Sequence, residues 1–141
     1  MAGFKPLSHT LRCLFITAPM KLPVVERSFV TIRSVLDGTA VMVTFKGTAD
    51  LRIQAALKDF LDDLHRESSA APAAQVQVDV RDLEFMSSAC FRQVVGWVSR
   101  VDEASGPYRI HFLCNPRQHW QRRSMRALAN FAGEVVTVES L

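Results

Sequence analysis

Residues 76–101 read VQVDVRDLEFMSSACFRQVVGWVSRV, and the spacing of the apolar residues changes near the middle of this stretch. Over residues 76–80, valine alternates with polar residues, which is the period of a β-strand. Further on, apolar residues recur three and four positions apart, as on one face of a helix: Phe91, Val94, Val95, Val98 and Val101. The change falls at Ser87 and Ser88. This stretch therefore predicts a strand, a short acidic loop and a helix that begins at paired serines.

A serine at the start of a helix can serve two purposes. Its side-chain oxygen can accept a hydrogen bond from an unpaired backbone N–H of the first turn. A phosphate attached to it would face the positive end of the helix dipole and add about −1.5 to −2 charges at neutral pH. Because Asp82 and Glu84 already make the preceding loop acidic, we expect an opposing partner surface to be basic. At Ser88, a plain helix cap and a phosphorylation site both remain open.

Length and composition predict one globular domain. The chain has 141 residues, 48% of them hydrophobic and 22% charged, which suffices to close a single hydrophobic core. The formal net charge of +3 comes from Lys5, Arg12 and Lys21, because residues 23–141 hold fourteen basic and fourteen acidic residues. This larger part of the chain is therefore electrically neutral, which disfavours non-specific binding to nucleic acid.

The sequence lacks the common catalytic, cofactor and metal motifs. It has no GxSxG, GxGxxG or P-loop pattern, and no HxxxH or HExxH spacing among its histidines: His9, His65, His111 and His119. An odd number of cysteines without a CxxC pair favours a reducing cytoplasm over a disulfide framework: Cys13, Cys90 and Cys114. For Cys90 we favour a buried structural role over a nucleophilic one. The missing motifs lead us to expect a protein that is not an enzyme and that has no cofactor or metal. Since no apolar run is long enough to span a bilayer, we also expect it to be cytoplasmic and without membrane contact.

Residues 1–22 and 23–141 differ in pattern. The first segment contains Pro6 and Pro19 and has no sustained periodicity, which predicts a flexible N-terminal arm. In the second segment, strand patterns cover residues 29–36, 40–45, 76–80, 108–114 and 134–139. Helices are predicted after Gly47-Thr48-Ala49-Asp50, from Ser88 and from Asn115-Pro116. Consecutive βαβ units predict an α/β fold with a mixed, mostly parallel β-sheet that helices cover mainly on one face.

Two aromatic positions raise the question of a binding surface. Trp97 lies off the apolar stripe of its helix, which predicts an interface. In the third helix, the spacing places Trp120, Leu128 and Phe131 on one inward stripe. The basic residues around this stripe are then expected in solvent: Arg117, His119, Arg122, Arg123 and Arg126. We favour a plain solvated face here, with an acidic protein partner and a nucleic-acid patch as alternatives.

The ordered set of motifs resembles the STAS domain, named for sulphate transporters and anti-sigma-factor antagonists. Members typically show Gly-x-x-Asp after the second strand, as Gly47 and Asp50 do here. A second typical pattern is an apolar pair followed by Asp-Ser-Ser-Gly or Asp-Ser-Thr-Gly, and residues 85–90 read Phe-Met-Ser-Ser-Ala-Cys. The resemblance covers about residues 24–140 and places Ser88 where the family's phosphorylated residue sits, with Ser87 as the second choice.

The chain also departs from the family pattern. Ser87 replaces the family's Asp, Ala89 its second hydroxyl residue and Cys90 its Gly. In the family, that Asp lies beside the phosphate acceptor and contributes to partner binding or to the kinase reaction. The departures therefore bear on the switch more than on the fold.

The resemblance implies a non-catalytic interaction module that is comparable to anti-sigma-factor antagonists. Its partners would be a regulatory serine kinase or anti-sigma factor, and a phosphatase could reverse the switch. The expected partner-binding residues are Gly47, Thr48, Asp50, Met86, Ser87, Ser88, Ala89, Arg92 and Trp97. Two alternatives remain: a constitutive scaffold or homo-oligomer supported by Trp97, and a small-ligand or nucleotide binder that uses the arginines of the third helix.

Overall fold

The computed structural model describes residues 22–70 and 74–141. Apart from Leu22, the predicted arm of residues 1–22 lies outside the described residues. One sheet has the strand order β1-β2-β3-β4-β5-β6. Its strands are β1 (Val24–Glu26), β2 (Val30–Asp37), β3 (Ala40–Ala49), β4 (Gln75–Met86), β5 (Arg109–Cys114) and β6 (Val136–Ser140). The helical elements are the 3-10 helix η1 (Leu51–Ile53) and the α-helices α2 (Gln54–Ala70), α3 (Ser88–Glu103) and α4 (His119–Phe131).

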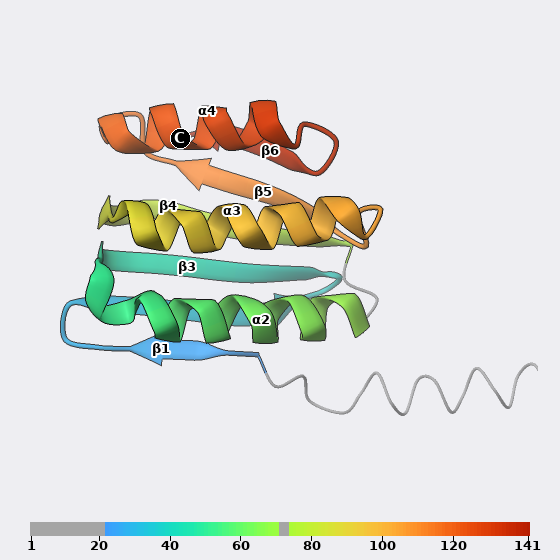
Figure 1. The fold of residues 1–141 in the computed structure, drawn as a ribbon, viewed down its shortest axis with the longest axis horizontal. Helices are drawn as coiled ribbons and strands as arrows, with labels where there is room; N and C mark the ends of the chain where they lie inside the picture. The colour runs from blue at the N-terminus through green and yellow to red at the C-terminus, as the bar shows by residue number, and fades with distance from the viewer. Residues whose placement is uncertain (1–21, 71–73) are drawn as a thin grey trace, which may run out of the picture.

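The sheet is mixed, as predicted. β1, β2 and β3 pair antiparallel, whereas β3, β4, β5 and β6 pair parallel. The three α-helices lie side by side on the same face of the sheet, with α2 nearest β1 and α4 nearest β6 (Figure 1). The predicted α/β fold with helices on one face is therefore confirmed. β1 has only three residues, too few to show a strand period, and the apolar spacing does not predict it.

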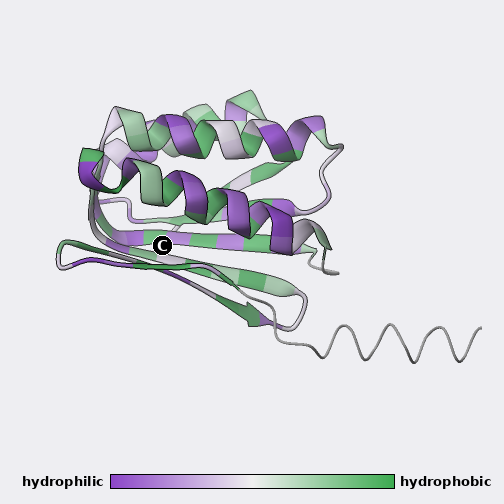
Figure 2. Cartoon of the chain, turned by 60° about the horizontal axis from the view of Figure 1, so that its bottom comes forward, coloured by the Kyte–Doolittle hydropathy of each residue, from purple (hydrophilic) through white to green (hydrophobic). Residues whose placement is uncertain are grey.

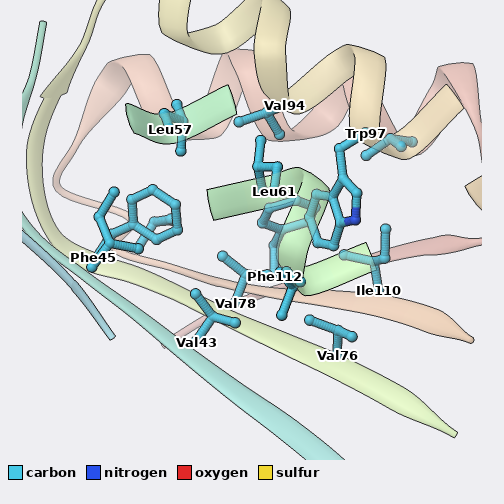
Figure 3. Packing of buried hydrophobic residues seen from close by; sticks show 14 of the residues in the cluster. Val43, Phe45, Leu57, Leu61, Val76, Val78, Val94, Trp97, Ile110 and Phe112 are labelled. Atoms are coloured by element: carbon cyan, nitrogen blue, oxygen red, sulfur yellow. The ribbon is translucent and has the colours of Figure 1, made fainter. Parts of the chain in front are cut away.

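The core lies between the sheet and this helical layer. In β3 the buried side chains alternate with partly exposed ones, so that Val41, Val43 and Phe45 face the helices. The apolar residues of η1 and α2 that recur at helical spacing, from Ile53 to Leu64, are also buried. Figure 3 shows side chains from the strands and from α2 and α3 meeting in this layer. Around each helix in Figure 2, hydrophobic and hydrophilic residues alternate, as expected for helices with only one face against a sheet.

The acidic stretch that we expected as a loop belongs to β4. The register with β3 shifts twice there, between Thr44 and Lys46 and between Gly47 and Thr48, so β4 carries more residues than the strand that it faces. The buried amide of Gln121 donates to the backbone oxygens of Val80 and Leu83 in this irregular part. The strand can therefore continue to Met86 although its regular pairing is interrupted.

The third helix differs from the expectation in two ways. It begins at His119 rather than at Asn115-Pro116, because Asn115 Oδ1 accepts a hydrogen bond from the backbone N–H of Arg117 in a turn that precedes the helix. Its inward stripe consists of Gln121, Met125 and Leu128, whereas Phe131 is 58% exposed. The buried face of α4 differs from the predicted one because it includes a glutamine, and apolar spacing does not mark a polar residue as buried.

Candidate functional site

The two sequence motifs meet at the carboxyl ends of β3 and β4, a region that we call the acceptor edge. It comprises residues 47–52 and 85–92. Because β3 and β4 run parallel, Ala49 lies opposite Met86, and the Ser87 N–H donates to the Ala49 backbone oxygen at 2.8 Å. The Gly47–Asp50 stretch and the paired serines, distant in sequence, are thus adjacent in space. Open α/β sheets commonly bind ligands at this end of the strands.

The two serines play different structural roles. Ser87 is the N-cap of α3, and its Oγ accepts a hydrogen bond from the Cys90 N–H at 3.2 Å. Ser88 is the first residue of the helix and is exposed to solvent. Among the described residues, its hydroxyl makes no hydrogen bond. The cap that we considered for Ser88 is therefore provided by Ser87, and the Ser88 hydroxyl is accessible.

Asp50 is held by an arginine two residues away. Its carboxylate accepts hydrogen bonds from the backbone N–H of Arg52 at 2.9 Å and from Nε and Nη2 of the same guanidinium at 3.0 and 2.7 Å. These bonds lower the pKa of Asp50 below its usual range. The guanidinium also lies over the Phe29 ring, 3.5 Å from its centroid. The charge of Asp50 is thus largely balanced by Arg52.

Gly47 joins the acceptor edge to the β1–β2 loop. Its φ is 99°, a conformation that other residues rarely adopt. A Cβ at this position would overlap the Phe29 carbonyl oxygen and stand 3.2 Å from the Val30 Cα. That carbonyl oxygen accepts a hydrogen bond from the Thr48 N–H at 2.8 Å. Steric contact with Phe29 and the positive φ therefore explain why this position of the first motif is a glycine.

Exposed apolar side chains lie within the acceptor edge. Leu51 is 68% exposed and Phe85 48% exposed, while Met86 and Ala89 are partly buried. Arg92 is exposed one helical turn after Ser88. The sequence motifs did not predict Leu51, Arg52 or Phe85 as partner-binding residues. Phe85 was visible as half of an apolar pair, but nothing in a single sequence shows that it faces solvent.

The expectation for Trp97 is wrong. This side chain is only 1% exposed and lies among the core residues shown in Figure 3, so it cannot form an interface in the folded protein. Its Nε1–H donates to the hydroxyl of buried Tyr108 at 2.8 Å, and that hydroxyl also bonds to His65 Nδ1 at 2.8 Å. Trp97 belongs to the buried face of α3, because it follows Val94 by three residues and precedes Val101 by four. Its indole N–H has a polar partner inside the core.

The chemistry of Cys90 favours its structural interpretation. Its side chain is fully buried, and Sγ donates to the backbone oxygen of Asp50 at 3.2 Å. Burial raises the pKa of the thiol, which disfavours the thiolate that nucleophilic attack requires.

In residues 22–70 and 74–141, no group of three or more potential metal ligands comes together. No helix in the same part of the chain is long and apolar enough to cross a bilayer.

Comparison with known proteins supports the fold. No protein-family model matches the chain, and no curated protein matches it in sequence. Among solved structures, it resembles an anti-sigma-factor antagonist from Mycobacterium paratuberculosis with a TM-score of 0.57 and 13% identity, over 72% of this chain and 81% of that one. It also resembles Bacillus SpoIIAA in its phosphorylated form, with a TM-score of 0.52 and 15% identity, over 77% and 90%. The unphosphorylated form of SpoIIAA gives 0.51 and 15%, over 77% and 87%. The chain therefore has a STAS-like fold.

Proposed function

We propose that this protein is a non-catalytic regulatory module that binds a partner protein through the acceptor edge and is switched by phosphorylation of Ser88. The observation that carries the proposal is the division of labour between the serines. Ser87 caps the helix, so Ser88 is free at its first position. A kinase could transfer a phosphate to this exposed hydroxyl without removing a cap.

The surroundings of Ser88 suit a charge-controlled contact. Leu51 and Phe85 offer apolar area for a partner, and the nearby Asp50 carboxylate is balanced by Arg52. A phosphate would add about −1.5 to −2 charges at this surface. It would also lie near the positive end of the α3 dipole, so the helix is stabilised by the modification. The same surface can therefore exist in two charge states with one fold.

Likeness to anti-sigma-factor antagonists suggests the class of partner. We propose a regulatory serine kinase or an anti-sigma factor, acting in the cytoplasm, with a phosphatase that restores the free serine. The contact residues proposed are Gly47, Thr48, Asp50, Met86, Ser87, Ser88, Ala89 and Arg92, together with Leu51 and Phe85. Trp97 is withdrawn from this set because it is buried.

Phosphorylation of the full chain tests the switch. The purified protein is incubated with ATP and an extract of the cells that encode it, and phosphate is mapped by mass spectrometry. We expect phosphate at Ser88 and its loss in Ser88→Ala, while Ser69→Ala, at an exposed serine of α2, retains it. Phosphate at Ser87 alone, or at neither serine of the pair, would remove the switch and leave only the binding role.

Constitutive binding is the second candidate, because two large apolar side chains are exposed at the acceptor edge without any modification. If this surface mediates self-association, Phe85→Asp should convert an oligomer to a monomer in sedimentation. A monomer in both proteins would argue against the scaffold alternative. Trp97→Arg is unsuitable for this purpose, since a charge at a buried position would unfold the domain.

A further inference from the structure

The outer side of α4 carries a row of arginines that differs from the rest of the molecule. Residues 115–133 contain four arginines and no aspartate or glutamate. All four are exposed, and we call them the arginine stripe: Arg117, Arg122, Arg123 and Arg126. The stripe lies at the β6 side of the helical layer, whereas the acceptor edge is built on β3, β4 and the start of α3 (Figure 1).

The arginines of the stripe have no carboxylate partner. Within residues 22–70 and 74–141, none of its four guanidinium groups lies within 4.0 Å of a carboxylate. Five of the eight other described arginines do pair in this way: Arg33, Arg52, Arg66, Arg81 and Arg100. Three charges of the stripe lie on α4 and Arg117 lies in the turn before it. Like charges this close repel each other, so a bound anion would relieve an unfavourable interaction.

A tryptophan beside the stripe supplies a rigid apolar element. Trp120 packs partly against the core and also lines a shallow hollow of about 710 Å³ together with His119, Arg122, Arg123, Ser124 and Arg126. Tryptophan and arginine are the residues that most often dominate the energy of protein interfaces. The hollow thus combines cationic groups with an aromatic side that is already held in place.

The charges around the stripe favour a short anionic partner over an extended one. Because residues 23–141 are neutral overall, the four positive charges of the stripe are offset by a net negative remainder. α2 lies at the other side of the same helical layer and carries Asp59, Asp62, Asp63 and Glu67 against only Lys58 and Arg66. A flat anionic membrane or a long nucleic acid would extend from the stripe toward this acidic helix and be repelled there. A short acidic segment would end within the stripe.

We propose that the arginine stripe is a second docking surface, which binds a short acidic segment of a partner protein. Within α4, Arg122 and Arg126 are four residues apart, or about 6 Å at the rise of a helix, and Arg117 lies in the turn before it. One or two turns of an acidic helix or a few residues of extended chain match this length. Planar guanidinium groups can each hold a carboxylate with two parallel hydrogen bonds. The surface does not depend on Ser88 and remains available in both states of the switch.

Binding of defined anions to the full chain tests this proposal. The probes are a fluorescent peptide of twelve residues rich in glutamate, the same peptide with glutamine in place of glutamate, a single-stranded oligonucleotide and vesicles containing anionic phospholipid. Affinity is measured by anisotropy, or by co-sedimentation for the vesicles, at about 0.05 and 0.15 M salt. The test variant is Arg122→Glu/Arg126→Glu. Its matched control is Arg33→Glu/Lys46→Glu, which makes the same charge change on strands β2 and β3 at exposed positions.

We expect the glutamate peptide to bind at least tenfold more tightly than the glutamine peptide and to lose at least tenfold in affinity in the test variant. The control should bind within about twofold of the unaltered protein, and circular dichroism should show that both variants are folded. Equal binding of the two peptides, or an equal loss in the control, would overturn the proposal. Tighter binding of the oligonucleotide or the vesicles would overturn it as well and assign the stripe to that anion instead.

Discussion

Replacing Gly47 with alanine should destabilise the protein far more than the same change at the other glycines of the chain. The φ of 99° alone costs an alanine about 1–2 kcal/mol. The added Cβ would also overlap the Phe29 carbonyl oxygen, so the β1–β2 loop must move. This movement breaks the hydrogen bond from Thr48 N to that oxygen, which contributes about 0.5–1.5 kcal/mol. Together these effects predict a loss of about 3 kcal/mol in the free energy of unfolding.

Two other glycines provide internal controls for this prediction. Gly38 has a φ of 64°, but nothing lies within 4 Å of the place that a Cβ would occupy, so Gly38→Ala should cost only the backbone term of about 1 kcal/mol. Gly96 lies in α3 with equally open surroundings. Because glycine weakens a helix, Gly96→Ala should stabilise the protein by about 0.5–1 kcal/mol.

Urea unfolding followed by far-ultraviolet circular dichroism measures all three variants, with the emission of buried Trp97 as a second probe. The predicted order of stability is Gly96→Ala, unaltered protein, Gly38→Ala and Gly47→Ala. If Gly47→Ala costs no more than Gly38→Ala, the β1–β2 loop does not approach β3 closely, and the proposed arrangement of the acceptor edge is wrong.

Three further predictions concern the helix start, the core and the pH dependence. Ser87→Ala should lose about 1 kcal/mol of stability with the N-cap, whereas Ser88→Ala should stay within about 0.5 kcal/mol of the unaltered protein in urea titrations; the reverse order would exchange their roles. Gln121→Leu should cost about 2–4 kcal/mol, because backbone oxygens of β4 lose their buried donor, and an unchanged urea midpoint would refute this. Burial lowers the pKa of His65 in the folded protein, so the unfolded chain binds the proton more readily. The stability that this histidine contributes is complete above about pH 6.5 and is lost as the pH falls below that value, so thermal unfolding should show a flatter profile between about pH 7 and 5 in His65→Gln.

The fold could be predicted because its elements keep to simple periods. The buried positions of β3 alternate, and the buried residues of η1 and α2 from Ile53 to Leu64 recur at helical spacing, so these elements follow directly from apolar spacing. The hairpin at Gly38 follows from the residues that a tight turn requires. The turn depends on residues that are neighbours in the sequence, and the strand and the helix each bury one apolar face. A single sequence is enough to show both patterns.

The errors arise where polar side chains are satisfied inside the core. Gln121 breaks the apolar pattern of α4, yet it is buried because backbone oxygens of β4 accept its hydrogen bonds. Trp97 is spaced with Val94 and Val101 on the buried face of α3, and the Tyr108 hydroxyl accepts its N–H. These partners lie outside the helices concerned, up to 41 residues away in the chain. A helical period cannot reveal them, since it reports only on neighbours along the same helix.

The candidate site was predictable in place but not in detail. The juxtaposition of Gly47–Asp50 with the paired serines follows from two parallel strands ending at one edge. The exposure of Leu51 and the bonding of Arg52 to Asp50 depend on the short 3-10 helix η1, and the exposure of Phe85 depends on the irregular end of β4. Geometry of this kind is not encoded in a periodic pattern.

The substitution of the family's aspartate by Ser87 changes the electrostatics of the acceptor edge more than its structure. Serine and aspartate are comparably good N-caps, so α3 begins where it would with either residue, but serine brings no charge. Asp50, the other acidic residue of the two motifs, is balanced by Arg52. The charged side chains within residues 47–52 and 85–92 are Asp50, Arg52 and Arg92, which sum to +1 before modification. A phosphate on Ser88 would therefore reverse the sign of the net charge of the acceptor edge. Loss of the aspartate thus removes a group that would repel the phosphate at close range. The charge added by phosphorylation is the same with either residue, but with serine it starts from a less negative surface.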